Sequence, residues 1–193
     1  MKINDKTIIQ VAMQVGLLKH VKRHGWILKG IRNSESVAEH SFRVTFLTML
    51  LHENRRLNKE KIMNMALLHD LGTALIGDIV YEQGRNIVAA FKYKHKDERN
   101  AFKEMFKDVE GKEKYLSLWD EFIAQTTPEA KFVKQVEKLE MVLQALEYEQ
   151  QGYEPVLFDE FWENASLYIK NSELEPLYRE LQEERLKKTQ YDR

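Results

Sequence analysis

The sequence contains no cysteine, and among its 193 residues there are only 3 Pro and 8 Gly. The absence of cysteine excludes disulfides and thiolate metal sites, so any bound metal must use histidine, carboxylate or water ligands. It also fits a reducing compartment, and we expect a cytoplasmic protein. Because helix-breaking residues are scarce, long helices are favoured over many strands and turns. The composition therefore predicts an all-α fold.

Long apolar runs and an excess of charge of one sign are also missing. No stretch approaches the ~20 apolar residues of a membrane-spanning helix, and the first ten residues, MKINDKTIIQ, do not have the pattern of a signal peptide. The 30 basic and 31 acidic residues leave a formal net charge of -1. Nucleic-acid surfaces need a basic excess to neutralise phosphates. We therefore expect no membrane segment and no polymeric nucleic-acid partner.

The length suits one domain with one core, so residues 1–193 are expected to form a single domain. Ser36 with Glu39 has the pattern of a capping box, Asn58 that of a helix cap, and Thr127-Pro128 that of a helix start. Residues 24–34 and 73–90 are predicted to be irregular, with at most one helical turn in the second range. Apolar periodicity and these caps predict helices over about 6–22, 36–51, 58–72, 94–109, 112–124, 128–150, 155–170 and 173–188.

Two histidines fall on apolar faces of predicted helices. His40 lies three residues after Val37 and four before Val44, and His69 lies four residues after Met65. A lone histidine in such a place is more often a core residue with one hydrogen bond than a ligand. Asp70 follows His69 at the end of its helix, where the helix dipole disfavours a carboxylate. A cation, either a basic side chain or a metal ion, is expected to compensate.

Glu137 lies four residues after Val133 and four before Met141, on an apolar line of the helix that starts at Pro128. A buried carboxylate is costly unless it is paired or binds a metal, although a surface acid at the edge of the apolar stripe fits the same pattern. The set His40, His69, Asp70 and Glu137 is more specific than any member alone. We predict that these four residues bind one divalent metal ion, Mn, Co, Mg, Zn, Ni or Fe, with positions left open for water and substrate.

The wider motifs carry a family resemblance. The segments SESVAEHSFRV (34–44), ALLHDLGTALIGDIV (66–80) and EAKFVKQVEKLEMVLQALEYE (129–149) resemble the HD superfamily of metal-dependent phosphohydrolases, and within it the 5′-deoxynucleotidase family. The resemblance covers roughly residues 10–185. It implies an HD-domain helical bundle with a metal site between helices, commonly a homodimer, and a small-molecule nucleotide as substrate. The implied reaction hydrolyses 2′-deoxynucleoside 5′-monophosphates to deoxynucleoside and phosphate.

The resemblance also implies roles for single residues. Three of the metal ligands match His40, His69 and Asp70. Glu137 stands where the family usually has Asp, which keeps the charge and adds one methylene. In the substrate site, Trp26 matches an aromatic residue, and Asp78 matches an acid that contacts substrate or water.

Thr73 departs from the family pattern. It stands three residues after Asp70, where the family usually has a Glu that orients or deprotonates the attacking water. A hydroxyl can hold a water but is not a base at neutral pH, and loss of a general base typically lowers the rate by about 10²–10⁴-fold. Asp70, Asp78 and Thr73 are therefore the candidate catalytic residues, with Asp78 able to take over the proton. The change predicts weak, altered or lost nucleotidase activity.

Candidate cations for the phosphate are Lys29, Arg32, Lys94 and His95, which taken singly are more often solvated surface charges. Two other functions fit the same motifs. A non-catalytic nucleotide-binding module of the same fold is favoured by Thr73, and binding without turnover would distinguish it. An HD hydrolase of another phosphate ester is the second, which a substrate panel would distinguish. Base preference and metal identity stay open at this point.

Overall fold

The computed structural model describes residues 4–53, 55–78 and 87–191, which form helices and no strand. This agrees with the predicted all-α fold. None of the described helices combines the length and the apolar character that a membrane span requires. The α-helices are α1 (Asp5–Gly16), α2 (His24–Leu28), α3 (Val37–Leu51), α4 (Lys59–Leu68), α5 (Thr73–Ile76), α6 (Ile87–Met105), α7 (Glu113–Ala124), α8 (Pro128–Gln150), α9 (Asp159–Ile169) and α10 (Glu175–Tyr191), and the two 3₁₀ turns are η1 (Leu17–Lys19) and η2 (Pro155–Phe158).

The predicted caps start three of the helices that carry the site. The Ser36 hydroxyl accepts the Glu39 backbone N–H at 3.2 Å, and the Glu39 carboxylate accepts the Ser36 backbone N–H at 2.6 Å, so the capping box of α3 is confirmed. The Asn58 side chain caps α4, and the Thr127 hydroxyl accepts the Ala130 N–H at the start of α8. Each cap satisfies a backbone donor that the first turn of the helix leaves free.

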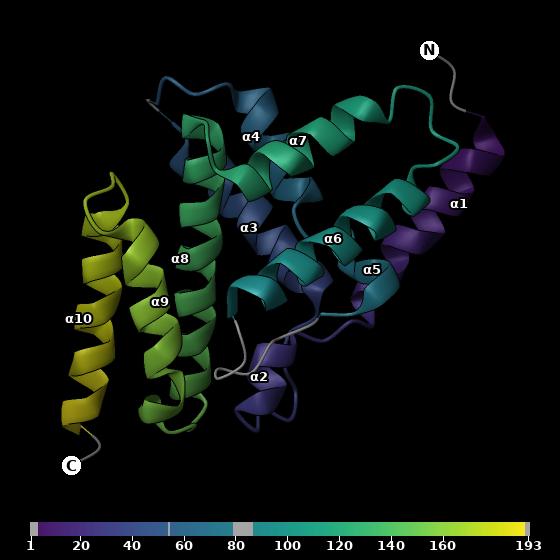
Figure 1. The fold of residues 1–193 in the computed structure, drawn as a ribbon. Coiled ribbons are helices and arrows are strands. Elements are labelled where there is room, and N and C mark those ends of the chain that lie inside the picture. Colours follow the sequence, from purple (N-terminus) through teal and green to yellow (C-terminus); the bar gives the residue numbers. More distant parts are fainter. Residues whose placement is uncertain (1–3, 54, 79–86, 192–193) are drawn as a thin grey trace.

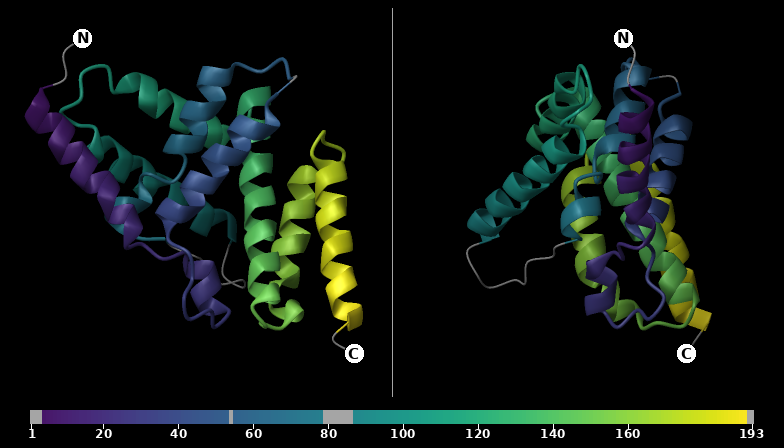
Figure 2. Two further views of the ribbon diagram at one scale, coloured as in Figure 1. Left: turned by 180° about the vertical axis from the view of Figure 1, so that it is seen from behind. Right: turned by 90° about the vertical axis from the view of Figure 1, so that its right-hand side faces the viewer.

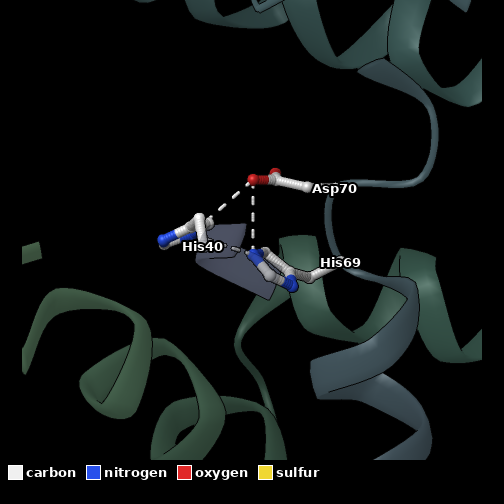
Figure 3. A group of neighbouring side chains, drawn as sticks. All are labelled: His40, His69 and Asp70. Atoms are coloured by element: carbon white, nitrogen blue, oxygen red, sulfur yellow. Dashed lines mark hydrogen bonds and ion pairs between the residues drawn. The ribbon is translucent and has the colours of Figure 1, made fainter. Parts of the chain in front are cut away.

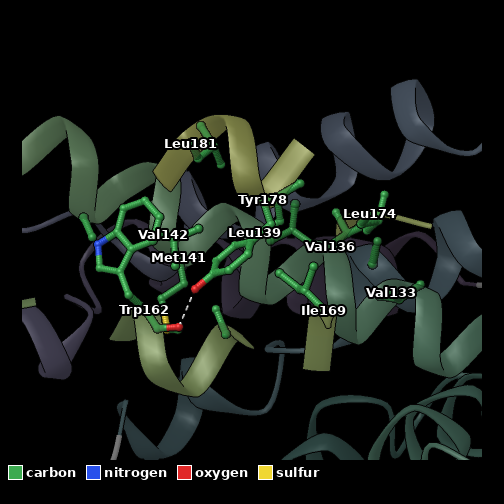
Figure 4. Close-up of a cluster of buried hydrophobic side chains, with 14 of the residues drawn as sticks. Val133, Val136, Leu139, Met141, Val142, Trp162, Ile169, Leu174, Tyr178 and Leu181 are labelled. Atoms are coloured by element: carbon green, nitrogen blue, oxygen red, sulfur yellow. Dashed lines mark hydrogen bonds between the residues drawn. The ribbon is translucent and has the colours of Figure 1, made fainter. Parts of the chain in front are cut away.

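Helix α8 is the centre of the bundle. It packs against α3, α4, α7 and α9, and α10 contacts it as well (Figures 1 and 2). The apolar side chains between α8, α9 and α10 form a continuous core, in which the Tyr178 hydroxyl donates to the Trp162 carbonyl at 2.7 Å (Figure 4). A second apolar cluster joins α6 and α7 to α5 and the start of α3. The site described below lies where these two clusters meet.

Several predicted boundaries are wrong. The range 24–34 is not wholly irregular, because α2 spans His24–Leu28 and buries Trp26. The helix expected at 94–109 begins at Ile87 and ends at Met105, and the first helix ends at Gly16 and continues as η1. Tertiary packing decides these ends, which local periodicity defines only loosely. Residues 79–86 of the predicted irregular range lie outside the described residues.

A short β-bridge holds the segment before α2 against the start of α3. Lys22 pairs with Ser36, the Arg23 N–H donates to the Glu35 carbonyl at 2.9 Å, and the Val37 N–H donates to the Val21 carbonyl at 2.8 Å. This pairing fixes the backbone of Arg23 beside the first turn of the helix that carries His40. It therefore places the guanidinium of Arg23, from the N-terminal part of the chain, at the site described below.

Candidate functional site

Three side chains from two helices converge at the junction. His40 projects from α3, and His69 and Asp70 follow directly after α4 (Figure 3). The Nε2 atoms of His40 and His69 are 3.3 Å apart, and the Asp70 Oδ2 lies 3.7 Å and 3.3 Å from them, respectively. Both imidazoles are almost fully buried. The sequence analysis expects these residues to project into the interior, and the structure brings the three together there.

The hydrogen bonds on the far sides of the two rings determine which nitrogens are free to bind. His69 Nδ1 lies 2.7 Å from the Ala66 carbonyl, to which it donates, and His40 Nδ1 pairs with the buried Glu140 carboxylate. With Nδ1 as the donor in each ring, both Nε2 atoms present a lone pair toward the same point. Two lone pairs and a carboxylate oxygen at these distances repel unless a cation, either a proton or a metal ion, lies between them. Burial lowers the pKa of His69, but Asp70 outweighs burial and raises that pKa, so a proton on His69 serves this purpose when no metal ion is bound. The donor set therefore fits a divalent metal ion.

Glu140 joins the candidate centre to a wider network. It is fully buried, and its second oxygen accepts from Arg43 Nε at 2.8 Å. Arg43 also donates to Gln144 and Glu147, each at 2.6 Å. Burial raises the pKa of Glu140, but His40 and Arg43 outweigh burial and lower that pKa. An ionised Glu140 fixes the orientation of His40, as carboxylates commonly do behind metal-binding histidines.

Asp70 is held ionised by its neighbours. Arg23 Nη1 donates to its Oδ2 at 3.2 Å. Burial raises the pKa of Asp70, but the charges of His69 and Arg23 outweigh burial and hold that pKa well below its usual range. Arg23 therefore supplies part of the positive charge that the sequence predicts beside this helix end, and a metal ion would supply more. Asp70 remains an acceptor at every physiological pH.

Glu137 does not join the three-residue group. Its carboxylate pairs with Lys134, and with Lys138 Nζ at 3.5 Å. Burial raises the pKa of Glu137, but the two lysines outweigh burial and lower it below the usual range. Burial lowers the pKa of Lys138 to about 8, although Glu137 opposes that shift. Glu137 is therefore buried near the centre, as its apolar line predicts, but its observed partners are lysines.

A cavity of about 520 Å³ opens beside His69 and Asp70. Such a volume lies within the roughly 300–1,000 Å³ of small-molecule sites. The cavity contains most of the predicted site residues together with several that the sequence did not suggest. It is lined by Arg23, Gly25, Trp26, Leu28, Lys29, His69, Asp70, Asp78, Lys94, His95, Glu98, Phe122, Ile123, Lys134, Glu137, Lys138, Met141, Glu160, Phe161 and Asn164.

Besides Asp70, five predicted substrate or catalytic residues line this cavity with defined partners. Asp78 accepts the His24 backbone N–H at 2.8 Å, and Lys94 Nζ lies 3.9 Å from its other oxygen. Lys29 pairs with Glu160 at 3.0 Å, and His95 lies 3.1 Å from Glu98. Trp26 is only 2% exposed, and its Nε1–H donates to Glu35 at 2.9 Å. Its ring therefore belongs mainly to the core and offers the cavity little surface for stacking.

Among the predicted substrate and catalytic residues, Arg32 and Thr73 do not line the cavity. Arg32 is exposed, and its backbone N–H lies 3.4 Å from the Tyr153 hydroxyl, away from the lining residues. Thr73 is 2% exposed, and its hydroxyl donates to the Asp70 carbonyl at 2.7 Å. This bond is the usual one for threonine inside a helical turn. In this structure the Thr73 hydroxyl is thus bonded to the backbone and does not line the cavity.

Sequence reasoning missed several charged groups that line the cavity or support it, Glu98 among them. Lys134 and Lys138 flank Glu137 at spacings of three and one, a pattern that was visible in the sequence. Arg23 and Glu140 gave no local signal, because their partners lie 47 and 100 residues away.

The sequence of this chain matches a known protein family. A family model described as "HD domain" matches residues 15–182. The chain belongs to the HD domain family. The predicted family and fold are thus confirmed. Curated relatives include the 5′-deoxynucleotidase HDDC2 of Xenopus laevis, 36% identical over 93% of this chain and 88% of the relative, and that of Homo sapiens, 34% identical over 93% and 87%.

Solved structures share the fold of this HD domain. A conserved hypothetical protein from Pyrococcus furiosus matches with a TM-score of 0.73 and 36% identity, over 91% of this chain and 97% of that chain. A protein from Pyrococcus horikoshii matches with a TM-score of 0.75 and 35% identity, over 90% and 97%. The likeness extends over about nine tenths of this chain and nearly the whole of each solved chain.

Proposed function

We propose that residues 1–193 form one HD domain that hydrolyses 2′-deoxynucleoside 5′-monophosphates to deoxynucleoside and phosphate in the cytoplasm, with one divalent metal ion. The observation that carries this proposal is the convergence of two imidazole nitrogens and the Asp70 carboxylate beside a nucleotide-sized cavity. The support from similarity is that relatives at 34–36% identity over 93% of the chain are named 5′-deoxynucleotidases.

The metal ion would be held by His40 Nε2, His69 Nε2 and Asp70 Oδ2, and Glu137 remains the predicted fourth ligand. When bound, a divalent metal supplies a lowered pKa for water and neutralises charge on phosphoryl oxygens. Nitrogen and oxygen donors suit Mn, Co, Mg, Zn, Ni or Fe, and the donor set alone does not choose among them. Glu140 behind His40 supports this assignment, because it fixes the ring in the orientation that a ligand needs.

The cations of the cavity would hold the phosphate. Arg23 pairs with Asp70, and Lys134 and Lys138 lie in the same wall. Guanidinium and ammonium donors in a partly buried cavity stabilise the charge of a phosphoryl group more strongly than they do in water. Lys94, between Asp78 and Glu98, is a fourth such cation. Asp78 is the predicted contact for the sugar hydroxyl or for water.

Phosphate release tests this function. After EDTA treatment and re-addition of Mn, Co, Mg or Zn, the wild type is expected to release phosphate from deoxynucleoside 5′-monophosphates faster than from the ribonucleotides. His69→Ala should abolish release and metal binding, because it removes a ligand. His52→Ala is the matched control, since His52 caps the exposed end of α3 and should leave the rate unchanged.

Other results would change the assignment. Nucleotide binding without release, in a metal-loaded wild type, would identify a binding module. Release only from other phosphate esters would retain the hydrolase and replace the substrate.

The predicted homodimer is also part of the proposal, and an apolar face supports it. Helices α3 and α4 expose large side chains around a groove that α1 also lines, among them Phe42, Phe46, Met49 and Leu67, with Phe42 75% exposed. Monomeric proteins rarely expose contiguous apolar patches of this kind. A second copy of the chain would cover this face.

The dimer is tested by solution mass, measured by size-exclusion chromatography with light scattering. The wild type is expected at twice the chain mass, and Phe42→Asp at the chain mass, because a charge is then buried in the apolar interface. Leu167→Asp is the control, since Leu167 is 81% exposed on α9, away from this face. A wild type that remains monomeric, or a Phe42→Asp variant that remains dimeric, would contradict this interface.

A further inference from the structure

Hydrolysis of a phosphate ester needs a group that accepts a proton from the attacking water. The hydroxyl of Thr73 is bonded to a backbone carbonyl and cannot serve. Among the described residues, the carboxylates that line the cavity are the candidates. These are Asp70, Asp78, Glu98, Glu137 and Glu160.

Four of the five carboxylates have other commitments. Asp70 belongs to the candidate metal centre, and Glu137 is paired with two lysines that keep it a weak base. Asp78 accepts the His24 backbone N–H at 2.8 Å, which ties it to the first turn of α2. The side chain of Glu160 is 49% exposed and therefore lies where water competes for its charge. Glu98 also has partners, Lys94 and His95, but one of them is an imidazole that can take a proton onward, so we retain Glu98 as the candidate.

Glu98 reaches the cavity because α6 lies directly against the turn that follows Asp70. A Cβ on Gly72 would be 2.7 Å from the Glu98 carbonyl oxygen, so only glycine permits this approach. The Glu98 backbone is thus next to Gly72, and its side chain, 9% exposed, lines the same cavity as Asp70. A carboxylate from α6 therefore lines the same cavity as Asp70, to which α5 contributes no residue.

The surroundings of Glu98 suit proton transfer. Its Oε2 lies 3.1 Å from His95 Nδ1, and Lys94 Nζ lies 3.6 Å from Oε1, beyond ordinary hydrogen-bond distance. The imidazole of His95 is 38% exposed, so a proton accepted by the carboxylate has a route to solvent. A carboxylate paired with an imidazole is a common arrangement for acid–base catalysis.

We propose that Glu98 is the general base of the hydrolysis, with His95 as the residue that passes the proton on. The proposal rests on the proposed function. In the step, the water oxygen forms a bond to phosphorus and the bond from phosphorus to O5′ breaks. One water proton passes to Glu98 and through His95 to solvent, the other stays on the phosphate, and O5′ takes up a proton from solvent.

Chemical rescue distinguishes a base from a structural ion pair. Glu98→Ala is expected to lower kcat by about 10²–10⁴-fold and to leave KM and metal affinity unchanged. Added sodium formate should restore part of kcat in this variant and have no effect on the wild type, because formate replaces the missing carboxylate. Glu98→Gln, which retains size and polarity, should lose kcat equally and should not respond to formate.

Glu104→Ala is the matched control. Glu104 lies on the same helix and pairs with Lys107, but its side chain is 59% exposed. It should keep the wild-type kcat. A wild-type kcat in Glu98→Gln would overturn the proposal, as would a loss in Glu98→Ala that formate does not restore. A metal-loaded wild type without turnover would overturn the proposed function itself, so the two failures are distinguishable.

Discussion

Glu140→Gln is expected to weaken metal binding by about 10–100-fold, the usual effect of removing a carboxylate behind a metal-binding histidine. The fully buried Glu140 carboxylate pairs with His40 Nδ1 and keeps His40 Nε2 free to bind. A neutral amide at this position can present its NH₂ group to the ring, which favours the tautomer with its proton on Nε2. Isothermal titration with Mn or Zn measures the change directly.

Glu147→Gln is the control for this prediction. Glu147 contacts the same Arg43 as Glu140 does, but its side chain is 47% exposed and it does not touch His40. Exposed ion pairs contribute little, so metal affinity should stay at the wild-type value. If both variants bind metal like the wild type, Glu140 does not orient the ligand.

Trp26→Ala is expected to lower the free energy of unfolding by about 3–5 kcal/mol, the range for removing a large buried aromatic side chain. The ring packs edge-on against Tyr148 and Phe158, with centroid distances of 5.4 Å and 5.9 Å, and lies 4.4 Å from Phe161. Urea denaturation of the metal-free protein measures the change.

Trp26→Phe separates packing from the indole hydrogen bond to Glu35. It retains most of the buried ring, so it should recover most of the lost stability and lose only the contribution of that bond, about 0.5–1.5 kcal/mol. An increase in KM of Trp26→Ala with unchanged stability would instead support the role as a substrate-stacking residue that the family resemblance implied. The 2% exposure of Trp26 argues for the core.

The predictions from sequence succeeded where the signal was local. The caps at Ser36, Asn58 and Thr127 depend on a few adjacent residues, and each forms as expected. His40 and His69 were placed on buried faces by a period of 3.6 residues, and the structure brings their Nε2 atoms to 3.3 Å. These inferences need only the geometry of one helix.

Two acidic residues on α8 show that the geometry of one helix is not enough to predict which partner a buried side chain meets. Glu137 and Glu140 are three residues apart, so they lie close together on one side of the helix, and both are buried. Only the rotation of α8 against α3 decides that Glu140 meets His40, while Glu137 turns to Lys134 and Lys138. Periodicity can assign a residue to the interior, but it does not identify the partner from another helix.

By itself, the sequence determined the all-α class, most of the helices and the burial of the two histidines, because each depends on short-range spacing. The tertiary structure alone decided that Arg23 meets Asp70, that Glu140 orients His40, and that Glu98 enters the cavity past Gly72. These contacts join residues far apart in the chain. They depend on how helices pack against one another, and no repeat along the sequence encodes that packing.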